Sequence, residues 1–212
     1  MSLFARLRDA AEGKGRLQGV ERLHEELLRR VKVSLRSLRR KDLTAVRHLV
    51  QLYLYDLGGD RWGVEADGTF GSRAWHRRFW TRRGRHHLVI RLDGRLAGFA
   101  LVADRAHFAG HGVREISEFF VLRKYRRRGV GTRAARVLFA RFLGRWELAE
   151  LTWNVAARRF WRHLIRRCAV GGVVERRRRH GHLSFFVQHF ATAREEPYGN
   201  SRKPPRRWVS LC

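Results

Sequence analysis

A strand, a basic loop and a glycine-rich helix start follow one another directly in residues 115–132, which read EISEFFVLRKYRRRGVGT. The apolar run predicts a buried strand, and Gly129 and Gly131 open a predicted amphipathic helix. Because glycine has no Cβ, a ligand can approach the backbone closely at these two positions. The first amides of a helix are unpaired and its dipole adds partial positive charge there, so the segment predicts a site for an anion such as a pyrophosphate.

The residues around this segment alternate between strand and helix patterns. Runs with a period of two predict strands, apolar stripes with a period near 3.6 predict helices, and the pair Asp93-Gly94 predicts a tight turn between two strands. Their order predicts an α/β fold with a mixed, mostly antiparallel central sheet flanked by helices on both faces. The predicted strands are 31–38, 87–92, 96–102, 115–122, 146–153, 172–175 and 183–190, the predicted helices are 43–57, 74–80, 129–142 and 157–165, and a basic turn is predicted at 176–181.

Two extensions flank this domain of residues 31–192. Residues 1–30 carry leucine and valine at helical spacing and predict an amphipathic helical extension, which packs on the domain or on a partner chain. Residues 193–212 hold all three prolines and no apolar periodicity, which predicts a basic, flexible C-terminal tail.

The charge is strongly unbalanced, with 47 lysines and arginines against 19 aspartates and glutamates and a formal net charge of +28. All but five of the basic residues are arginine, a bias that a GC-rich genome also produces. Such a field attracts polyanions and predicts nonspecific binding of nucleic acid at low salt.

Several classes of protein are excluded by composition. No apolar run approaches the roughly 18 residues of a membrane-spanning helix, and the N-terminus has no apolar signal region. The two cysteines, Cys168 and Cys212, cannot form a disulfide scaffold or a four-thiolate zinc site. We therefore expect a cytoplasmic enzyme or binding protein with no membrane partner and no metal.

The glycine segment leaves two kinds of pyrophosphate open. No Walker A pattern is present, but residues 129–134 (GVGTRA) satisfy a loose dinucleotide fingerprint, with Glu147 and Glu150 about 20 residues further on. Two features argue against a nicotinamide cofactor: this fingerprint starts past the midpoint of the chain, and it follows a basic loop instead of a strand.

The second kind of pyrophosphate comes with a family resemblance. Residues 126–131 (RRRGVG), entered from a strand that ends in FFVL, resemble the acyl-CoA motif Arg/Gln-x-x-Gly-x-Gly/Ala of the GNAT superfamily of N-acyltransferases. Residues 154–161 (NVAARRFW) resemble the second conserved segment of that superfamily, and the order of elements resembles its fold over about residues 31–191.

This resemblance implies that acetyl-CoA, or another acyl-CoA, is the acyl donor, with no metal. It implies that the backbone of Phe119 and Val121 pairs with the pantetheine arm and that Asn154 meets the same arm from the next strand. A backbone N–H near Val121 would stabilise the oxyanion of the tetrahedral intermediate. The residues expected around the pyrophosphate are Arg126, Arg127, Arg128, Gly129, Val130, Gly131 and Thr132.

Attack of an amine on a thioester needs a base, because amines are mostly protonated at pH 7. Glu118 and Glu115 lie on the strand beside the expected thioester, and Glu118 is the favoured base. A regular strand points residues of odd and even number to opposite faces, so it cannot present both to the acceptor. The alternative for Glu118 is a pairing with one of the many arginines.

The leaving thiolate also needs a proton, and here the chain departs from the family pattern. The tyrosine that supplies this proton in the family falls on Trp161, whose indole N–H is no useful acid. Water or another group must then protonate the thiolate, or the transferase activity has been lost. The tyrosines of the chain are Tyr53, Tyr55, Tyr125 and Tyr198.

The sequence thus predicts an N-acetyltransferase that transfers an acetyl group from acetyl-CoA to a primary amine of a small molecule. The resemblance implies that the acceptor is framed by Tyr53, Tyr55 and Asp56, by residues 60–70 and by the hairpin at 176–182. One alternative is an acyltransferase-fold protein that acts on or binds RNA, favoured by the basic charge. Another is a catalytically degenerate CoA-binding module, favoured by Trp161. A homodimer is kept as an option for its assembly.

Overall fold

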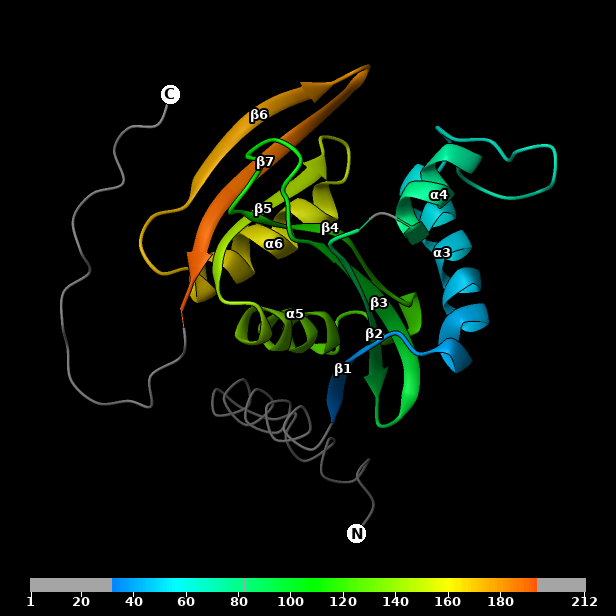
Figure 1. The fold of residues 1–212 in the computed structure, drawn as a ribbon, viewed down its shortest axis with the longest axis horizontal. Coiled ribbons are helices and arrows are strands. Elements are labelled where there is room, and N and C mark those ends of the chain that lie inside the picture. The colour runs from blue at the N-terminus through cyan, green and yellow to red at the C-terminus, as the bar shows by residue number, and fades with distance from the viewer. Residues whose placement is uncertain (1–31, 82, 194–212) are drawn as a thin grey trace, which may run out of the picture.

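The computed structural model describes residues 32–81 and 83–193, so the extension expected at 1–30 and all but the first residue of the tail expected at 193–212 lie outside it. Within the described residues, seven strands form one sheet in the order β1-β2-β3-β4-β5-β7-β6 (Figure 1). All neighbours pair antiparallel except β4 and β5, which are parallel. The strands are β1 (Val33–Ser37), β2 (Arg85–Leu92), β3 (Arg95–Ala103), β4 (Arg114–Val121), β5 (Gly144–Leu151), β6 (Val174–His180) and β7 (Leu183–Thr192).

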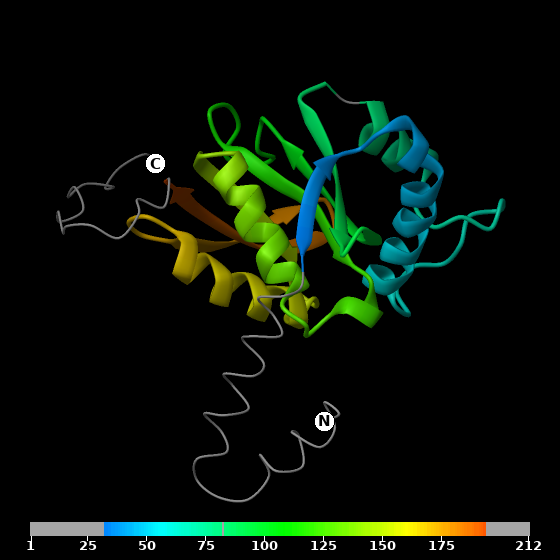
Figure 2. The same ribbon diagram turned by 90° about the horizontal axis from the view of Figure 1, so that it is seen from below.

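Helices cover both faces of this sheet, as Figures 1 and 2 show. Adjacent residues of β2 illustrate the two layers, because Leu88 and Ile90 pack with α5 and α6 whereas Val89 packs with α3 and α4. The α/β fold predicted from the sequence is therefore confirmed. The helices are α3 (Leu43–Gly58), α4 (Arg73–Thr81), α5 (Val130–Arg141) and α6 (Val155–Cys168), with 3-10 turns η1 (Arg40–Asp42) and η2 (Arg123–Tyr125). None of the helices in the described ranges is long and apolar enough to span a bilayer.

The parallel pair β4 and β5 separates part-way along its length. Their pairing runs only from Arg114 opposite Trp146 to Ile116 opposite Leu148, after which β4 continues to Val121 and β5 to Leu151 without pairing to each other. Figure 1 shows β5, β7 and β6 turning away from β2, β3 and β4. The two halves of the sheet thus form a V.

A β-bulge interrupts β4 just where the V opens. Leu101 pairs with Glu118 while the next residue, Val102, pairs with Ile116, so Ser117 is the extra residue. A bulge shifts the alternation of side chains by one position. Accordingly, Ile116 packs in the core layer of α5 and α6, whereas Phe120 packs against α3 and α4, although a regular strand would place both on one face.

The last hairpin differs from the prediction. The basic run at 176–179 was expected to form a turn, but it lies inside β6, and the turn is confined to Gly181 and His182. Gly181 has a φ of 57°, which suits a tight turn. Four consecutive arginines are tolerated in a strand here because β6 is an edge strand with exposed side chains.

Candidate active site

Two adjacent cavities lie where β4 and β5 diverge. The larger, of about 610 Å³, reaches Gly129 and Gly131 and is called the glycine cavity; the smaller, of about 400 Å³, is lined by Glu115 and Glu118 and is called the carboxylate cavity. The two meet at a junction formed by the residues that line both, namely Tyr53, Leu57, Phe119, Asn154, Ala157 and Trp161.

The N-terminus of α5 forms one wall of the glycine cavity. Gly129 precedes the helix with a φ of 69°, in the left-handed region that glycine adopts without strain. The helix begins at Val130, so the amides of its first turn have no partner four residues earlier. Gly131 also lines the cavity, and a Cβ there would lie 3.4 Å from the Phe160 ring, so a larger residue would crowd that ring.

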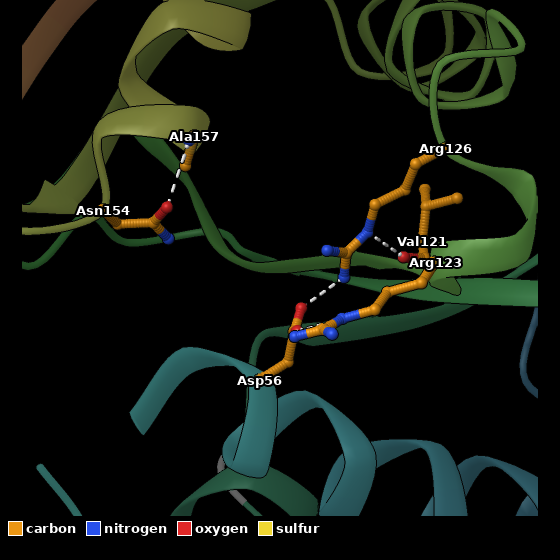
Figure 3. Close-up of polar contacts among 6 residues, drawn as sticks. All are labelled: Asp56, Val121, Arg123, Arg126, Asn154 and Ala157. Atoms are coloured by element: carbon orange, nitrogen blue, oxygen red, sulfur yellow. Dashed lines mark hydrogen bonds and ion pairs between the residues drawn. The ribbon is translucent and has the colours of Figure 1, made fainter. Parts of the chain in front are cut away.

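Arg126 lies across this cavity from Asn154 and is already held by two oxygen atoms (Figure 3). Its Nε donates to the backbone oxygen of Val121 at 2.8 Å, and its Nη2 donates to the carboxylate of Asp56 on α3. Arg123 donates to the same carboxylate from Nε at 2.7 Å. Partial burial raises the pKa of Asp56, but the hydrogen bonds from Arg126 and Arg123 outweigh it and hold that pKa below its usual value.

The other predicted donor-site residues divide into two groups. Phe119, Arg127 and Thr132 line the glycine cavity, and Arg127 has an unusual φ of 56° for a residue with a side chain. Arg128 and Val130 do not line it, because the Arg128 side chain is exposed and that of Val130 is buried in the core beneath α5. Any role of these two residues toward a pyrophosphate falls to their backbone amides.

Asn154 follows β5 and caps the start of α6. Its Oδ1 accepts a hydrogen bond from the backbone N–H of Ala157 at 3.1 Å, a typical N-cap contact. The same side chain lines both cavities, and Figure 3 shows its Nδ2 on the side away from Ala157. Asn154 therefore combines a structural role with a position at the junction.

Glu115 and Glu118 both line the carboxylate cavity, contrary to the expectation that only one could. The bulge at Ser117 supplies the physical reason, because it removes one step of alternation between the two residues. The negative charge of Glu115 even acts on Glu118 and raises its pKa. The prediction of opposite faces is wrong for this strand because the strand is not regular.

Glu118 is hydrogen-bonded to a tyrosine, and the positive charge of Arg85 also acts on it and lowers its pKa. The Tyr53 hydroxyl, from α3, donates to Oε2 of Glu118 at 2.5 Å. Burial raises the pKa of Glu118 to about 7, although the hydrogen bond from Tyr53 acts in the opposite direction. Burial and the Glu118 charge raise the pKa of Tyr53 well above its usual value, so the phenol stays protonated.

Two buried glutamates of β5 have opposite surroundings. Glu147 accepts hydrogen bonds from the amides of Phe108 and Ala109 at 2.9 and 2.7 Å and contacts His189 at 2.8 Å, and these partners outweigh burial and lower its pKa. Since Glu147 holds the β3–β4 loop, it does not serve a dinucleotide ribose.

Glu150 lines the carboxylate cavity, and neither of its oxygens has a hydrogen-bond partner among the described residues. Burial, followed by the charge of Glu175, raises the pKa of Glu150 to about 8.

Of the three residues expected near the acceptor on the first helix, Tyr53 lines the carboxylate cavity, Asp56 lines the glycine cavity and Tyr55 lines neither. Sequence reasoning did not predict the partners of Tyr53 and Asp56, nor the place of Glu150 in the carboxylate cavity. The signal for Tyr53 was its place on the apolar stripe of the helix at 43–57, which had to face the sheet. The signal for Glu150 was its period-two spacing from Trp146 and Leu148, which placed a carboxylate on a buried face. No local pattern marked Asp56 as the partner of two arginines about 70 residues away.

The comparison with known families agrees with this geometry. Residues 45–164, more than half of the chain, match the model of the acetyltransferase (GNAT) family. The protein belongs to the GNAT family. It is thus an acyltransferase of a family that uses acetyl-CoA.

Solved structures of other GNAT proteins share its fold. The GCN5-related N-acetyltransferase of Kribbella flavida is 18% identical, with a TM-score of 0.53 over 75% of this chain and 97% of its own. The PaiA N-acetyltransferase of Thermoplasma acidophilum, solved in complex with coenzyme A, is 14% identical, with a TM-score of 0.53 over 76% and 99%. An acetyltransferase of Thermus thermophilus is 16% identical, with a TM-score of 0.51 over 76% and 97%. No curated protein sequence matches this chain at a significant level.

In this GNAT protein, Trp161 occupies the position that the family resemblance assigns to a tyrosine. The indole is buried at the junction and packs edge-on against Phe119, with ring centroids 5.0 Å apart. Its ring centroid also lies 4.8 Å from that of Phe160. Trp161 therefore shapes the floor of both cavities but brings no acid to them.

Proposed function

We propose that this protein transfers the acetyl group of acetyl-CoA to a primary amine of a small molecule held in the carboxylate cavity. The observation that carries the proposal is the position of Glu118, a half-buried carboxylate with a pKa of about 7, beside the junction of two cavities. A base with a pKa near the working pH combines ionisation with proton affinity and is the most effective kind.

The donor would bind in the glycine cavity. The amides from Arg127 to Thr132 would hold the pyrophosphate at the N-terminus of α5, where the helix dipole favours an anion. The backbone of Phe119 and Val121 and the Nδ2 of Asn154 would hold the pantetheine arm along the open edge of β4. Since a carbonyl oxygen has two lone pairs, Val121 can accept from the pantetheine while Arg126 keeps its contact.

The acceptor would bind in the carboxylate cavity, whose 400 Å³ is within the range of small-molecule pockets. Glu118 would take a proton from the amine as the nitrogen attacks the thioester carbon, and Glu115 assists by keeping the pKa of Glu118 high. Aromatic rings complete the wall and favour an acceptor with an apolar part; they are Trp62, Trp75, Phe108 and Phe185.

The exposed arginines of β6 favour a second, weaker interaction of the protein, with nucleic acid. Arg176, Arg177, Arg178 and Arg179 are all exposed on the edge of the sheet. We propose that they contribute to salt-dependent, nonspecific binding of nucleic acid, which disappears as ionic strength rises. This association is separate from the chemistry at the junction.

Calorimetric titration with acetyl-CoA at about 0.3 M salt tests the donor site, because the diffuse charge is strongly screened there. NAD and a short oligonucleotide serve as control polyanions. We expect saturable one-to-one binding of acetyl-CoA alone. Binding of all three that fades together with salt would refute the proposed donor site.

Release of the coenzyme A thiol then tests turnover. The amine panel consists of 2-phenylethylamine, spermidine, glycinamide and an amino sugar, with acetyl-CoA as donor. We expect thiol release that depends on one of these amines. Tight binding of acetyl-CoA with no release above the protein-free rate would favour a CoA-binding module over an enzyme.

A further inference from the structure

The proposed reaction ends with a sulfur atom that needs a proton. When the C–S bond of the tetrahedral intermediate breaks, the electron pair goes to sulfur and a thiolate forms. Since the donor lies in the glycine cavity and the acceptor in the carboxylate cavity, this sulfur must leave at the junction between them. The proton donor must therefore reach the junction.

Among the described residues, Tyr53 is the one titratable residue at that junction. Of the six residues that line both cavities in the described part of the chain, three are polar or carry an N–H, namely Tyr53, Asn154 and Trp161. The amide of Asn154 and the indole of Trp161 do not exchange protons as acids. The phenol of Tyr53 does, and it comes from α3, on the opposite side of the sheet from Trp161.

The contact between Tyr53 and Glu118 couples the two proton transfers. While Glu118 is ionised, its charge and hydrogen bond keep the proton on Tyr53. Once Glu118 has taken the proton of the attacking amine, it is neutral, and the charge that held the phenol proton is gone. Tyr53 thus becomes more acidic at the stage at which the thiolate forms.

We infer that Tyr53 protonates the leaving thiolate of coenzyme A and is reprotonated by Glu118, in place of the tyrosine that Trp161 replaces. The inference rests on the proposed function. The amine enters in its neutral form, having lost its ammonium proton to solvent. The N–C bond forms as a proton of this neutral amine passes to Glu118, and the C–S bond breaks as the Tyr53 proton passes to sulfur. Glu118 then returns its proton to Tyr53, so the products are the acetylated amine and the free thiol, and both residues regain their starting forms.

The test compares two acyl donors with different needs for an acid. Thiol release from acetyl-CoA is compared with release of p-nitrophenolate from p-nitrophenyl acetate, whose leaving group is stable without a proton. Both use the panel amine that gives the fastest release. The variant is Tyr53→Phe, and the control is Tyr55→Phe, since Tyr55 lies on the same helix but is 59% exposed and contacts only Phe70 among the aromatic rings described.

We expect Tyr53→Phe to lower kcat with acetyl-CoA about 10²-fold or more, the usual size of a general-acid contribution, and with p-nitrophenyl acetate no more than about threefold. The calorimetric Kd for acetyl-CoA should stay within about twofold, because Tyr53 makes no charged contact to the donor. Tyr55→Phe should match the wild type with both donors. These results together would support Tyr53 as the acid.

Two outcomes would overturn the inference while leaving the proposed function intact. An equal loss with both donors would mean that Tyr53 only positions Glu118 for the attack. No loss with acetyl-CoA would mean that water or another group protonates the thiolate. Failure of the proposed function is a separate result, because the wild-type protein would then release no thiol with any amine of the panel.

Discussion

The glycine cavity and the carboxylate cavity meet at the same six residues, yet they are built in different ways. Half of the residues that line the glycine cavity come from one continuous segment, from the end of β4 past η2 into α5, and much of what this segment offers is backbone. The carboxylate cavity depends on side chains from α3, α4, β4, β5, the β3–β4 loop and the last hairpin. A site made from local backbone can be recognised in a sequence, whereas a site made from distant side chains depends on how the strands are paired.

The largest effect is expected from a substitution that removes the base of the carboxylate cavity and leaves the glycine cavity unchanged. Glu118→Gln keeps the shape of the side chain but removes the base, and kcat should fall about 10²–10⁴-fold. Calorimetry should give an unchanged Kd for acetyl-CoA. In the wild-type protein, kcat/KM should fall about tenfold for each pH unit below about 7, because the base must be ionised and burial raises its pKa to that value. A flat pH profile between 5 and 7 would argue against Glu118.

The converse change breaks the glycine cavity alone. Gly129→Glu places a bulky negative side chain at the N-terminus of α5 and should abolish binding of acetyl-CoA in the calorimeter. Gly129→Ala is the matched control, because it carries the same strain at a φ of 69° without the charge. If both variants bind alike, the helix N-terminus is not the pyrophosphate site.

A substitution of Glu150, in the carboxylate cavity, should change the stability of the protein in a pH-dependent way. Its folded-state pKa of about 8 lies above the usual value of 4.5, so its contribution to stability is complete at low pH and is lost as the pH rises toward 8. Glu150→Gln removes this pH dependence. The difference in unfolding free energy between variant and wild type should therefore be more favourable to the variant at pH 8 than at pH 5, by about 2–3 kcal/mol. Urea unfolding at the two pH values measures this. The control Glu147→Gln should destabilise the protein instead, because Glu147 is hydrogen-bonded.

Asn154 allows its two roles at the junction to be separated. Asn154→Ser keeps an N-cap oxygen for α6, and its melting temperature should stay close to the wild type, whereas Asn154→Ala should cost about 1 kcal/mol. Both variants lack Nδ2, and both should weaken acetyl-CoA binding about five- to tenfold. A wild-type Kd for the serine variant would reduce Asn154 to a helix cap.

The smallest expected effect concerns the contact that joins α3 to the glycine cavity. Asp56→Asn removes the carboxylate that holds Arg126 and Arg123, which frees Arg126 for a phosphate and should tighten acetyl-CoA binding about two- to fivefold. Asp60→Asn is the control, since Asp60 lies just beyond the same helix and contacts only its neighbour Arg61 among the ion pairs described. Weaker binding of the Asp56 variant would show that the pairing places Arg126 correctly.

Much of the fold was predictable from periodicity, because the strands and helices of the core alternate in the spacing that each structure requires. That Gly129, Gly131 and Arg126 meet in one cavity was predictable because they lie close together in the sequence. It was not predictable that residues 176–179 form part of a strand, since a charged run resembles a turn unless its neighbouring strand is known. The bulge at Ser117 also leaves no local signal, and with it the shared face of Glu115 and Glu118 and the pairing to Tyr53 stayed hidden.

The arginine run of β6 has a consequence for the solubility of the folded protein. An edge strand presents unpaired backbone groups to which another strand can add, and charged side chains are a common protection against this. A second copy that paired edge to edge with β6 would bring two runs of four arginines together, at a cost that is largest at low ionic strength. Polyanions that neutralise this edge would remove the protection, so nucleic acid in a lysate should promote aggregation of the protein and a nuclease treatment should reverse it.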